Sequence, residues 1–174
     1  MIDDVAATAA EGKPRACRPK RRMASARGYK QEGRRLRQQD ERVVVVRARH
    51  RSTGQVVAVK SLHHRSGGSY VGDIMREACF MAAGGGHPSL VTFRTVARSP
   101  GTMDYSIVTD YVGPSLRTVI GDRVEQPFSE DEVCRVMRQP VAGAKVMHGH
   151  GVVHRDIKPD NILVGDGGAV KICN

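Results

Sequence analysis

Short runs of valine-rich apolar sequence dominate the first part of the chain and predict strands. Two such runs, 43–48 and 55–62, flank the turn-like sequence Arg-Ser-Thr-Gly at 51–54, so they predict an antiparallel pair. Two further candidate strands, 90–97 and 105–111, flank a second turn. Between the two pairs, residues 73–83 have a helical apolar face that ends at three consecutive glycines.

A long amphipathic helix is the clearest element of the second part of the chain. Ser129 and Glu132 have the spacing of a capping box and mark its start. Apolar residues then recur with a period of 3.6, at Val133, Val136, Met137, Val141, Ala144 and Met147. A short hairpin of 162–164 and 169–172 follows. Because strands precede the helical region and do not alternate with it, the order of elements predicts an α+β fold.

Positive charge is concentrated near the N-terminus. The 174 residues include 28 Lys+Arg and 18 Asp+Glu, a net charge of +10, and most of the excess lies within residues 13–42. This segment has no sustained apolar period, so we expect residues 1–35 to form a disordered basic arm. The basic arm could act as a nuclear-import signal or make non-specific contacts with a polyanion such as nucleic acid. The alternative interpretation is a solvated tail that has no dedicated partner.

Several classes of protein are excluded by composition. No apolar run approaches the ~20 residues of a membrane-spanning helix, so we expect no membrane contact. The four cysteines form no CxxC pair, which favours a reducing compartment, and the expected location is cytoplasmic or nuclear. Histidines at 148, 150 and 154 give a rival metal-site hypothesis, but no cysteine or carboxylate is spaced to complete a ligand set.

The residues best suited to chemistry are concentrated in one loop, His-Arg-Asp-Ile-Lys-Pro-Asp-Asn at 154–161. An aspartate that can accept a hydroxyl proton, a nearby lysine and an asparagine that can bind a hard cation are the groups that phosphoryl transfer needs. Upstream, Lys60 ends an apolar strand, where it can hold phosphate oxygens, and Glu77 on the following helix can pair with it. Taken singly, each of these features is weak, because charges at strand ends and on helices are usually solvated.

Together these segments resemble the protein kinase family. The loop is similar to the family's HRDxKPxN catalytic loop, and Val-Ala-Val-Lys at 57–60 is similar to its strand-three lysine motif. The resemblance is to eukaryotic-type serine/threonine kinases, and most to cyclin-dependent-kinase relatives. It implies a small lobe with an antiparallel β-sheet, one helix and a hinge over 36–112, and the start of a helical large lobe over 113–174.

The resemblance also implies a role for each matching residue. Asp156 would be the catalytic base, Lys158 would steady the transferring phosphoryl group, and Asn161 would bind Mg²⁺. Lys60, paired with Glu77, would bind the α- and β-phosphates of ATP. The adenine site would consist of apolar residues, the gatekeeper and the hinge backbone: Val45, Ala58, Thr109, Asp110, Val112 and Leu163.

The implied activity is transfer of the ATP γ-phosphate to serine or threonine of a protein substrate, with a cyclin-like or other protein partner. Three features depart from the family pattern. Gln38, Asp40 and Val43 stand where the phosphate loop would have glycines. Pro140 lies within the long helix, and Asn174 stands where the aspartate that binds Mg²⁺ is expected. We therefore expect a truncated kinase chain of low or no activity, with a pseudokinase-like scaffold that binds a protein partner as the alternative.

Overall fold

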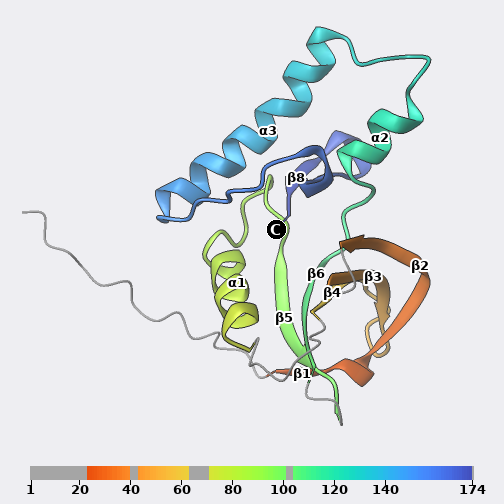
Figure 1. Ribbon diagram of the computed structural model, residues 1–174, viewed down its shortest axis with the longest axis vertical. Coiled ribbons are helices and arrows are strands. Elements are labelled where there is room, and N and C mark those ends of the chain that lie inside the picture. The colour runs from red at the N-terminus through yellow and green to blue at the C-terminus, as the bar shows by residue number, and fades with distance from the viewer. Residues whose placement is uncertain (1–22, 40–42, 63–70, 101–103, 174) are drawn as a thin grey trace, which may run out of the picture.

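The computed structural model describes residues 23–39, 43–62, 71–100 and 104–173. Within these residues a curled, six-stranded sheet with one helix beside it forms the first part of the molecule. Two further helices and a two-stranded hairpin form the second part, at one end of the sheet (Figure 1). The α+β class predicted from the order of elements is confirmed.

The sheet has the strand order β1-β5-β6-β4-β3-β2. All neighbouring strands are antiparallel except β1 and β5, which are parallel. The strands are β1 (Ala24–Ser25), β2 (Tyr29–Gln39), β3 (Val43–His50), β4 (Val56–Leu62), β5 (Phe93–Arg98) and β6 (Tyr105–Asp110). The four predicted strands are therefore confirmed as β3 to β6. β5 begins later than predicted, because the backbone of Ser89 and Val91 is hydrogen-bonded to Ile172 instead.

The N-terminal boundary of the folded part differs from the sequence prediction. β1, the single turn η1 (Ala26–Gly28) and the start of β2 all lie within residues 23–35, a part of the chain that the sequence predicts to belong to the basic arm. Small side chains of this segment pack, with Tyr29, against a buried cluster of the sheet. The residues that make these contacts are few and are separated by basic residues, so this part of the sequence shows no apolar period. Residues 1–22 lie outside the described part, and for them the arm stays a prediction.

Helix α1 (Val71–Ala83) lies against one face of the sheet and confirms the helix predicted over 73–83. Ile74 and Ala78, four residues apart, pack on Val96 of β5 and Ile107 of β6. Neighbouring residues of a strand point to opposite faces of a sheet. The opposite face accordingly has its own buried cluster of Ala48, Val57, Ala97 and Val108.

The second part of the chain begins with α2 (Leu116–Asp122), which we did not predict. Its local signal is Ser115, whose hydroxyl accepts a hydrogen bond from the backbone N–H of Thr118. The predicted hairpin is confirmed as β7 (Ile162–Val164) and β8 (Val170–Ile172), with the single turns η2 (Pro159–Asn161) before it and η3 (Asp166–Gly168) at its tip. A buried cluster of Leu116, Ile162 and Val170 joins α2 to the hairpin.

Helix α3 (Glu130–Gly149) begins at the predicted capping box. The Glu132 N–H donates to Ser129 Oγ at 3.3 Å, and the Ser129 N–H donates to Glu132 Oε2 at 2.9 Å. The Ser129 N–H, together with the Arg123 guanidinium, lowers the pKa of Glu132 below its usual value. The start of this helix is therefore fixed by reciprocal hydrogen bonds.

The rest of α3 runs through Pro140 without interruption, and Pro140 is buried. Gln139, its neighbour, accepts a hydrogen bond from the Val170 N–H and donates one to the Gly168 carbonyl, which fixes the helix to the hairpin. Part of the apolar stripe stays exposed, namely Val133, Met137 and Val141. No helix in the described ranges is both long and apolar enough to cross a membrane.

The segment that connects the sheet to the second part lies directly against the hairpin. The Val164 N–H donates to the Pro114 carbonyl at 2.9 Å, and Ser115 forms an isolated bridge with Leu163. A Cβ atom on Gly113 would lie only 2.0 Å from the Val164 carbonyl oxygen. Only glycine therefore permits this close approach of the two backbones.

We expect Gly113→Ala to destabilise the fold by about 1–3 kcal/mol, because the overlap forces the connecting segment away from β7. Gly121→Ala is the matched control: it is helical and its Cβ would meet nothing within 4 Å, so its stability should be unchanged or about 0.5–1 kcal/mol higher. Urea denaturation followed by circular dichroism measures both. Equal stability of the two variants would contradict the close approach.

Candidate active site

A cleft of about 740 Å³ lies between the sheet and the β7–β8 hairpin. Valine and alanine side chains of β3 and β4 line one side of the cleft, and Leu163 of β7 lines the other side. Five of the six residues predicted for the adenine site line this cleft: Val45, Ala58, Thr109, Val112 and Leu163. The structure thus brings together residues that are spread over more than a hundred positions of sequence.

An ion pair crosses one wall of the cleft. Lys60 Nζ, on β4, lies 2.7 Å from Glu77 Oε1, on α1, and both side chains are mostly buried, with 21% and 16% exposed. Glu77 is placed by the packing of α1, since Ile74 and Ala78 on the same side of the helix are fixed in the core. The predicted pairing of Lys60 with Glu77 is present in the structure.

The second charged group of the cleft surrounds Asp156. Lys158 Nζ lies 2.9 Å from Asp156 Oδ2. The Asn161 amide nitrogen donates to the same oxygen at 2.9 Å and to the backbone carbonyl of Asp156 at 2.7 Å. The hydrogen bond from Lys158, followed by that from Asn161, lowers the pKa of Asp156 and outweighs the effect of partial burial. Asp156 is therefore held as a carboxylate, with one side free of these two partners.

The backbone of the loop is fixed by His154. The Asp156 N–H donates to His154 Nδ1 at 3.2 Å, so Nδ1 is an acceptor and Nε2 carries the proton that meets the Cys173 carbonyl at 3.0 Å. Arg155, between them, has a φ of 65°, a left-handed conformation uncommon for a residue with a side chain. His154 is thus structural here. Within the described ranges, no three His, Cys, Asp or Glu side chains are grouped to hold a metal ion.

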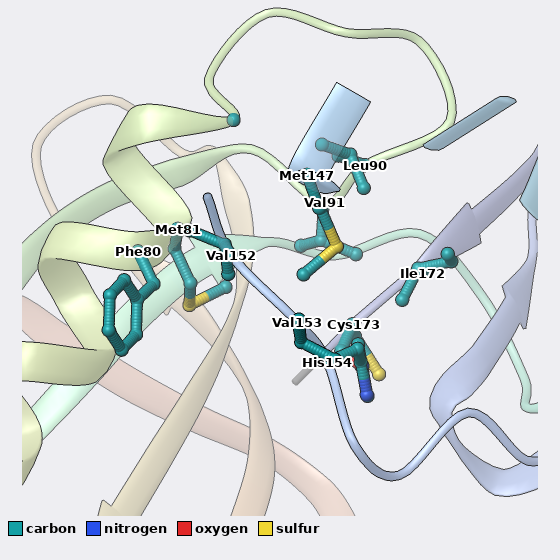
Figure 2. A pocket seen from close by; sticks show the side chains of 11 residues that line it. Phe80, Met81, Leu90, Val91, Met147, Val152, Val153, His154, Ile172 and Cys173 are labelled. Atoms are coloured by element: carbon teal, nitrogen blue, oxygen red, sulfur yellow. The ribbon is translucent and has the colours of Figure 1, made fainter. Parts of the chain in front are cut away.

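A second, smaller cavity of about 60 Å³ lies behind the cleft, between α1 and the end of β8 (Figure 2). Its lining is apolar apart from His154, with Phe80 and Met81 from α1 and Met147 from α3. Met81, Val91 and Cys173 line both the small cavity and the main cleft, so these three residues lie between the two spaces. The histidine that fixes the loop is therefore held in an apolar setting.

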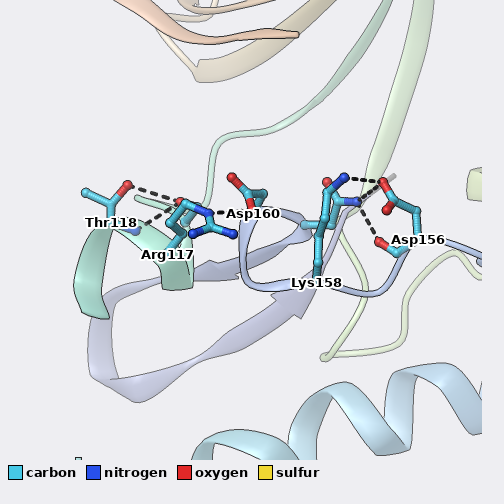
Figure 3. A network of polar contacts seen from close by, with 7 residues as sticks. Arg117, Thr118, Asp156, Lys158 and Asp160 are labelled. Carbon is cyan, nitrogen blue, oxygen red and sulfur yellow. Dashed lines mark hydrogen bonds and ion pairs between the residues drawn. The ribbon is translucent and has the colours of Figure 1, made fainter. Parts of the chain in front are cut away.

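A further ion pair lies at the edge of the cleft, between α2 and η2. Arg117 Nε, on α2, lies 2.7 Å from Asp160 Oδ2, on η2. Figure 3 shows Asp156, Lys158 and Asp160 along one loop, with Arg117 reaching Asp160 from α2. This contact joins α2 to the loop in addition to the apolar cluster beneath them, so it steadies the loop that carries Asp156.

Sequence reasoning missed several residues that line the cleft, among them Glu32, Leu36 and Arg47. Register shifts in β2 place Leu36 outside regular pairing, between Arg35 and Arg37, and such bulges cannot be read from spacing. The Arg47 guanidinium lies over the Tyr111 ring at 5.1 Å and within 4.0 Å of Glu32. The alternation of β3, which places Arg47 on the same face as Val45, is the signal that would have identified it.

Two predicted site residues do not line the cleft. The side chain of Asp110 is paired with Arg94, and its N–H donates to the Thr92 carbonyl, so neither faces a ligand. Lys158 does not line the cleft, and it contacts the site through its ion pair with Asp156. Asn174 and Asp40 lie outside the described residues, whereas Val43, at a predicted glycine position, lines the cleft.

Comparison with known proteins agrees with this geometry. The model of the protein kinase domain family matches residues 41–174, so the chain belongs to the protein kinase domain family. The loop 154–161, Lys60 and the strands β3 to β6 all lie within the matched part, whereas β1 and β2 precede it. Members of this family generally use ATP and Mg²⁺.

The curated relatives include several cyclin-dependent kinases. A putative cyclin-dependent kinase F-2 of Oryza sativa subsp. japonica is 46% identical over 139 residues, covering 75% of this chain and 42% of that protein. Cyclin-dependent kinase G-1 of Oryza sativa subsp. indica is 32% identical and is covered over 19% of its length, and cyclin-dependent kinase 4 of Ovis aries is 31% identical and is covered over 46%. The expected likeness to this branch is confirmed, and the chain spans less than half the length of these relatives.

The charge state of Asp156 gives a test of the site geometry. We expect Lys158→Met to raise the pKa of Asp156 toward the ordinary range, because the variant removes the main hydrogen bond to the carboxylate. Since the folded pKa is below the unfolded one, the interaction stabilises the fold at neutral pH and is lost as the pH falls through the folded pKa. Carboxyl ¹³C NMR titration measures the pKa directly.

The exposed Lys145 on α3 supplies the control. Lys145→Met removes the same charge away from the cleft and should leave the pKa of Asp156 unchanged. An unchanged pKa in Lys158→Met, or an equal rise in both variants, would contradict the contact with Lys158.

Proposed function

We propose that the chain supplies the ATP site and the catalytic loop of a serine/threonine protein kinase. The observation that carries the proposal is the position of two charged groups on one cleft. Lys60 with Glu77 lies on the sheet side, and Asp156 with its partners lies on the hairpin side. A cation for phosphate and a carboxylate for the acceptor hydroxyl therefore face the same space.

The cleft fits a nucleotide in size and in character. Its volume of about 740 Å³ falls within the range usual for small-molecule sites. Val45 and Ala58 on one side and Leu163 on the other offer apolar faces to a base. The Asp110 N–H donates to the Thr92 carbonyl, and the backbone of Val112, which lines the cleft, would meet the base edge.

Asn161 fits the role of a Mg²⁺ ligand. Its amide nitrogen donates to Asp156, which fixes the orientation of the amide group, and an amide oxygen is a ligand that suits a hard cation. Bound Mg²⁺ would neutralise charge on the phosphates. Lys60, held by Glu77, would place a second positive charge against phosphate oxygens.

Asp156 is suited to accept the proton of a substrate hydroxyl. Its side chain is 52% exposed, so a serine or threonine hydroxyl can approach it. Its low pKa means that positioning matters more than basic strength, as in other phosphoryl transfers. Lys158, 2.9 Å away, would orient the carboxylate and stabilise charge on the transferring group.

We extend the proposal to a cyclin-class protein partner and to a cytoplasmic or nuclear location. Support for the partner comes from the names of the relatives, and support for the location comes from composition alone. A pseudokinase-like scaffold is the second candidate. It is favoured by Val43, which lines the cleft where a phosphate loop would have a glycine.

Phosphate incorporation separates these candidates. With radiolabelled Mg-ATP and a generic basic protein, we expect the chain to transfer phosphate at a low rate and Asp156→Asn to lower that rate by about 10²–10⁴-fold, because the general base is lost. Asp122→Asn, at the exposed end of α2, is the matched control and should keep the rate. No incorporation by the parent chain, while Mg-ATP still binds, would favour the scaffold; equal rates in parent and Asp156→Asn would contradict the assigned base.

A further inference from the structure

Arg47 of β3 lies at the end of the cleft that is farther from Lys60. In the pairing of β3 with β4, Lys60 is opposite Val45. Arg47, two residues after Val45, is opposite Ala58, so it lies about 6.6 Å farther along the strand. All four residues line the cleft. Since Lys60 would bind the phosphates, Arg47 belongs to the end where the base would lie.

The Arg47 guanidinium is held against the segment that follows β6. It lies over the Tyr111 ring, 5.1 Å from the ring centroid, and Tyr111 also lines the cleft. A cation over an aromatic face is an attractive contact, so it limits where the guanidinium can lie. Tyr111 precedes Val112, whose backbone would meet the base edge. Arg47 is therefore fixed beside the part of the cleft that would recognise the base.

In the described part of the chain, no acceptor is hydrogen-bonded to the Arg47 guanidinium. Its Nε is buried and has no hydrogen-bond partner. The Glu32 carboxylate is near, but its Oε2 lies 4.0 Å from this nitrogen, which is beyond hydrogen-bond distance. Both Glu32 oxygens instead accept hydrogen bonds from Arg49, at 2.6 and 3.3 Å. The Arg47 side chain is 42% exposed, so its outer part can reach a ligand in the cleft.

We propose that Arg47 is a specificity residue of the cleft, which donates hydrogen bonds to the ring nitrogens of a purine base. The inference rests on the proposed function, since it requires a nucleotide in this cleft. The Val112 backbone would meet one edge of the base, which leaves the other ring nitrogens as acceptors. A guanidinium presents its donors in one plane, as the hydrogen-bonding edge of a base requires. Arg47 would thus add affinity for the base, and Lys60 would add affinity for the phosphates.

Calorimetric titration of the full chain separates these two contributions with three ligands: adenosine, Mg-ATP and magnesium tripolyphosphate, which has no base. Arg47→Met keeps an apolar stem but removes the donors. We expect it to weaken the binding of adenosine and of ATP equally, by about tenfold, as loss of a charge-assisted hydrogen bond implies. Its affinity for tripolyphosphate should not change. Arg51→Met, in the turn after β3 and outside the cleft, is the matched control and should bind all three ligands as the parent chain does.

Two further variants test whether the donors or the charge are responsible. Lys60→Met should show the reverse pattern, with weaker binding of ATP and tripolyphosphate and unchanged binding of adenosine. Arg47→Lys keeps the charge without the planar donors, so its affinity for adenosine should fall between those of the parent chain and Arg47→Met. An equal loss of tripolyphosphate affinity in Arg47→Met, no change in its adenosine affinity, or full recovery by Arg47→Lys would each overturn the proposal.

Failure of the proposed kinase activity has a different signature in these experiments. A parent chain that binds adenosine and ATP but transfers no phosphate would favour the scaffold, and the affinities of the Arg47 variants would still decide the role of Arg47. A parent chain that binds none of the three ligands would overturn both the nucleotide site and the role of Arg47.

Discussion

The ion pair between Lys60 and Glu77 is the contact on which the site depends. Two mostly buried charges are stable only when they are paired, so the sheet and α1 must meet at this point. The packing of Ile74 and Ala78 on β5 and β6 brings Glu77 to Lys60. On the far side of the cleft, the close approach at Gly113 holds the β7–β8 hairpin in place. Together these contacts keep Lys60 and Asp156 facing one cleft.

Most of the fold is predictable from sequence because its elements are amphipathic. The valine-rich strands, the capping box at Ser129 and the helix that carries Glu77 have local signals that the structure confirms. The elements missed are β1, η1, β2 and α2, together with the single turns η2 and η3. Their positions depend on tertiary contacts such as those of Leu116 with the hairpin, and no local period reveals these.

The charged and polar residues of the candidate site could be predicted from their types and their spacing in the sequence. Lys60, Glu77, Asp156 and Asn161 were identified because their types match phosphoryl transfer, and the structure places all four along the cleft. Leu36 could not be identified, since bulges in β2 shift its register. Asp110 was placed in the adenine site; its side chain is paired with Arg94 and its N–H donates to the Thr92 carbonyl, contacts that depend on how β5 and β6 pair.

Amide chemical-shift mapping with Mg-ATP tests most directly whether this cleft is the nucleotide site. In ¹⁵N-labelled chain, we predict saturable shifts at residues that border the cleft, led by Lys60, Val112 and Leu163, at an ionic strength high enough to screen surface charge. Triphosphate without a base would bind a basic surface as well as ATP does, so it serves as the comparison. Shifts confined to the basic residues before position 36, equal for ATP and triphosphate, would contradict the account.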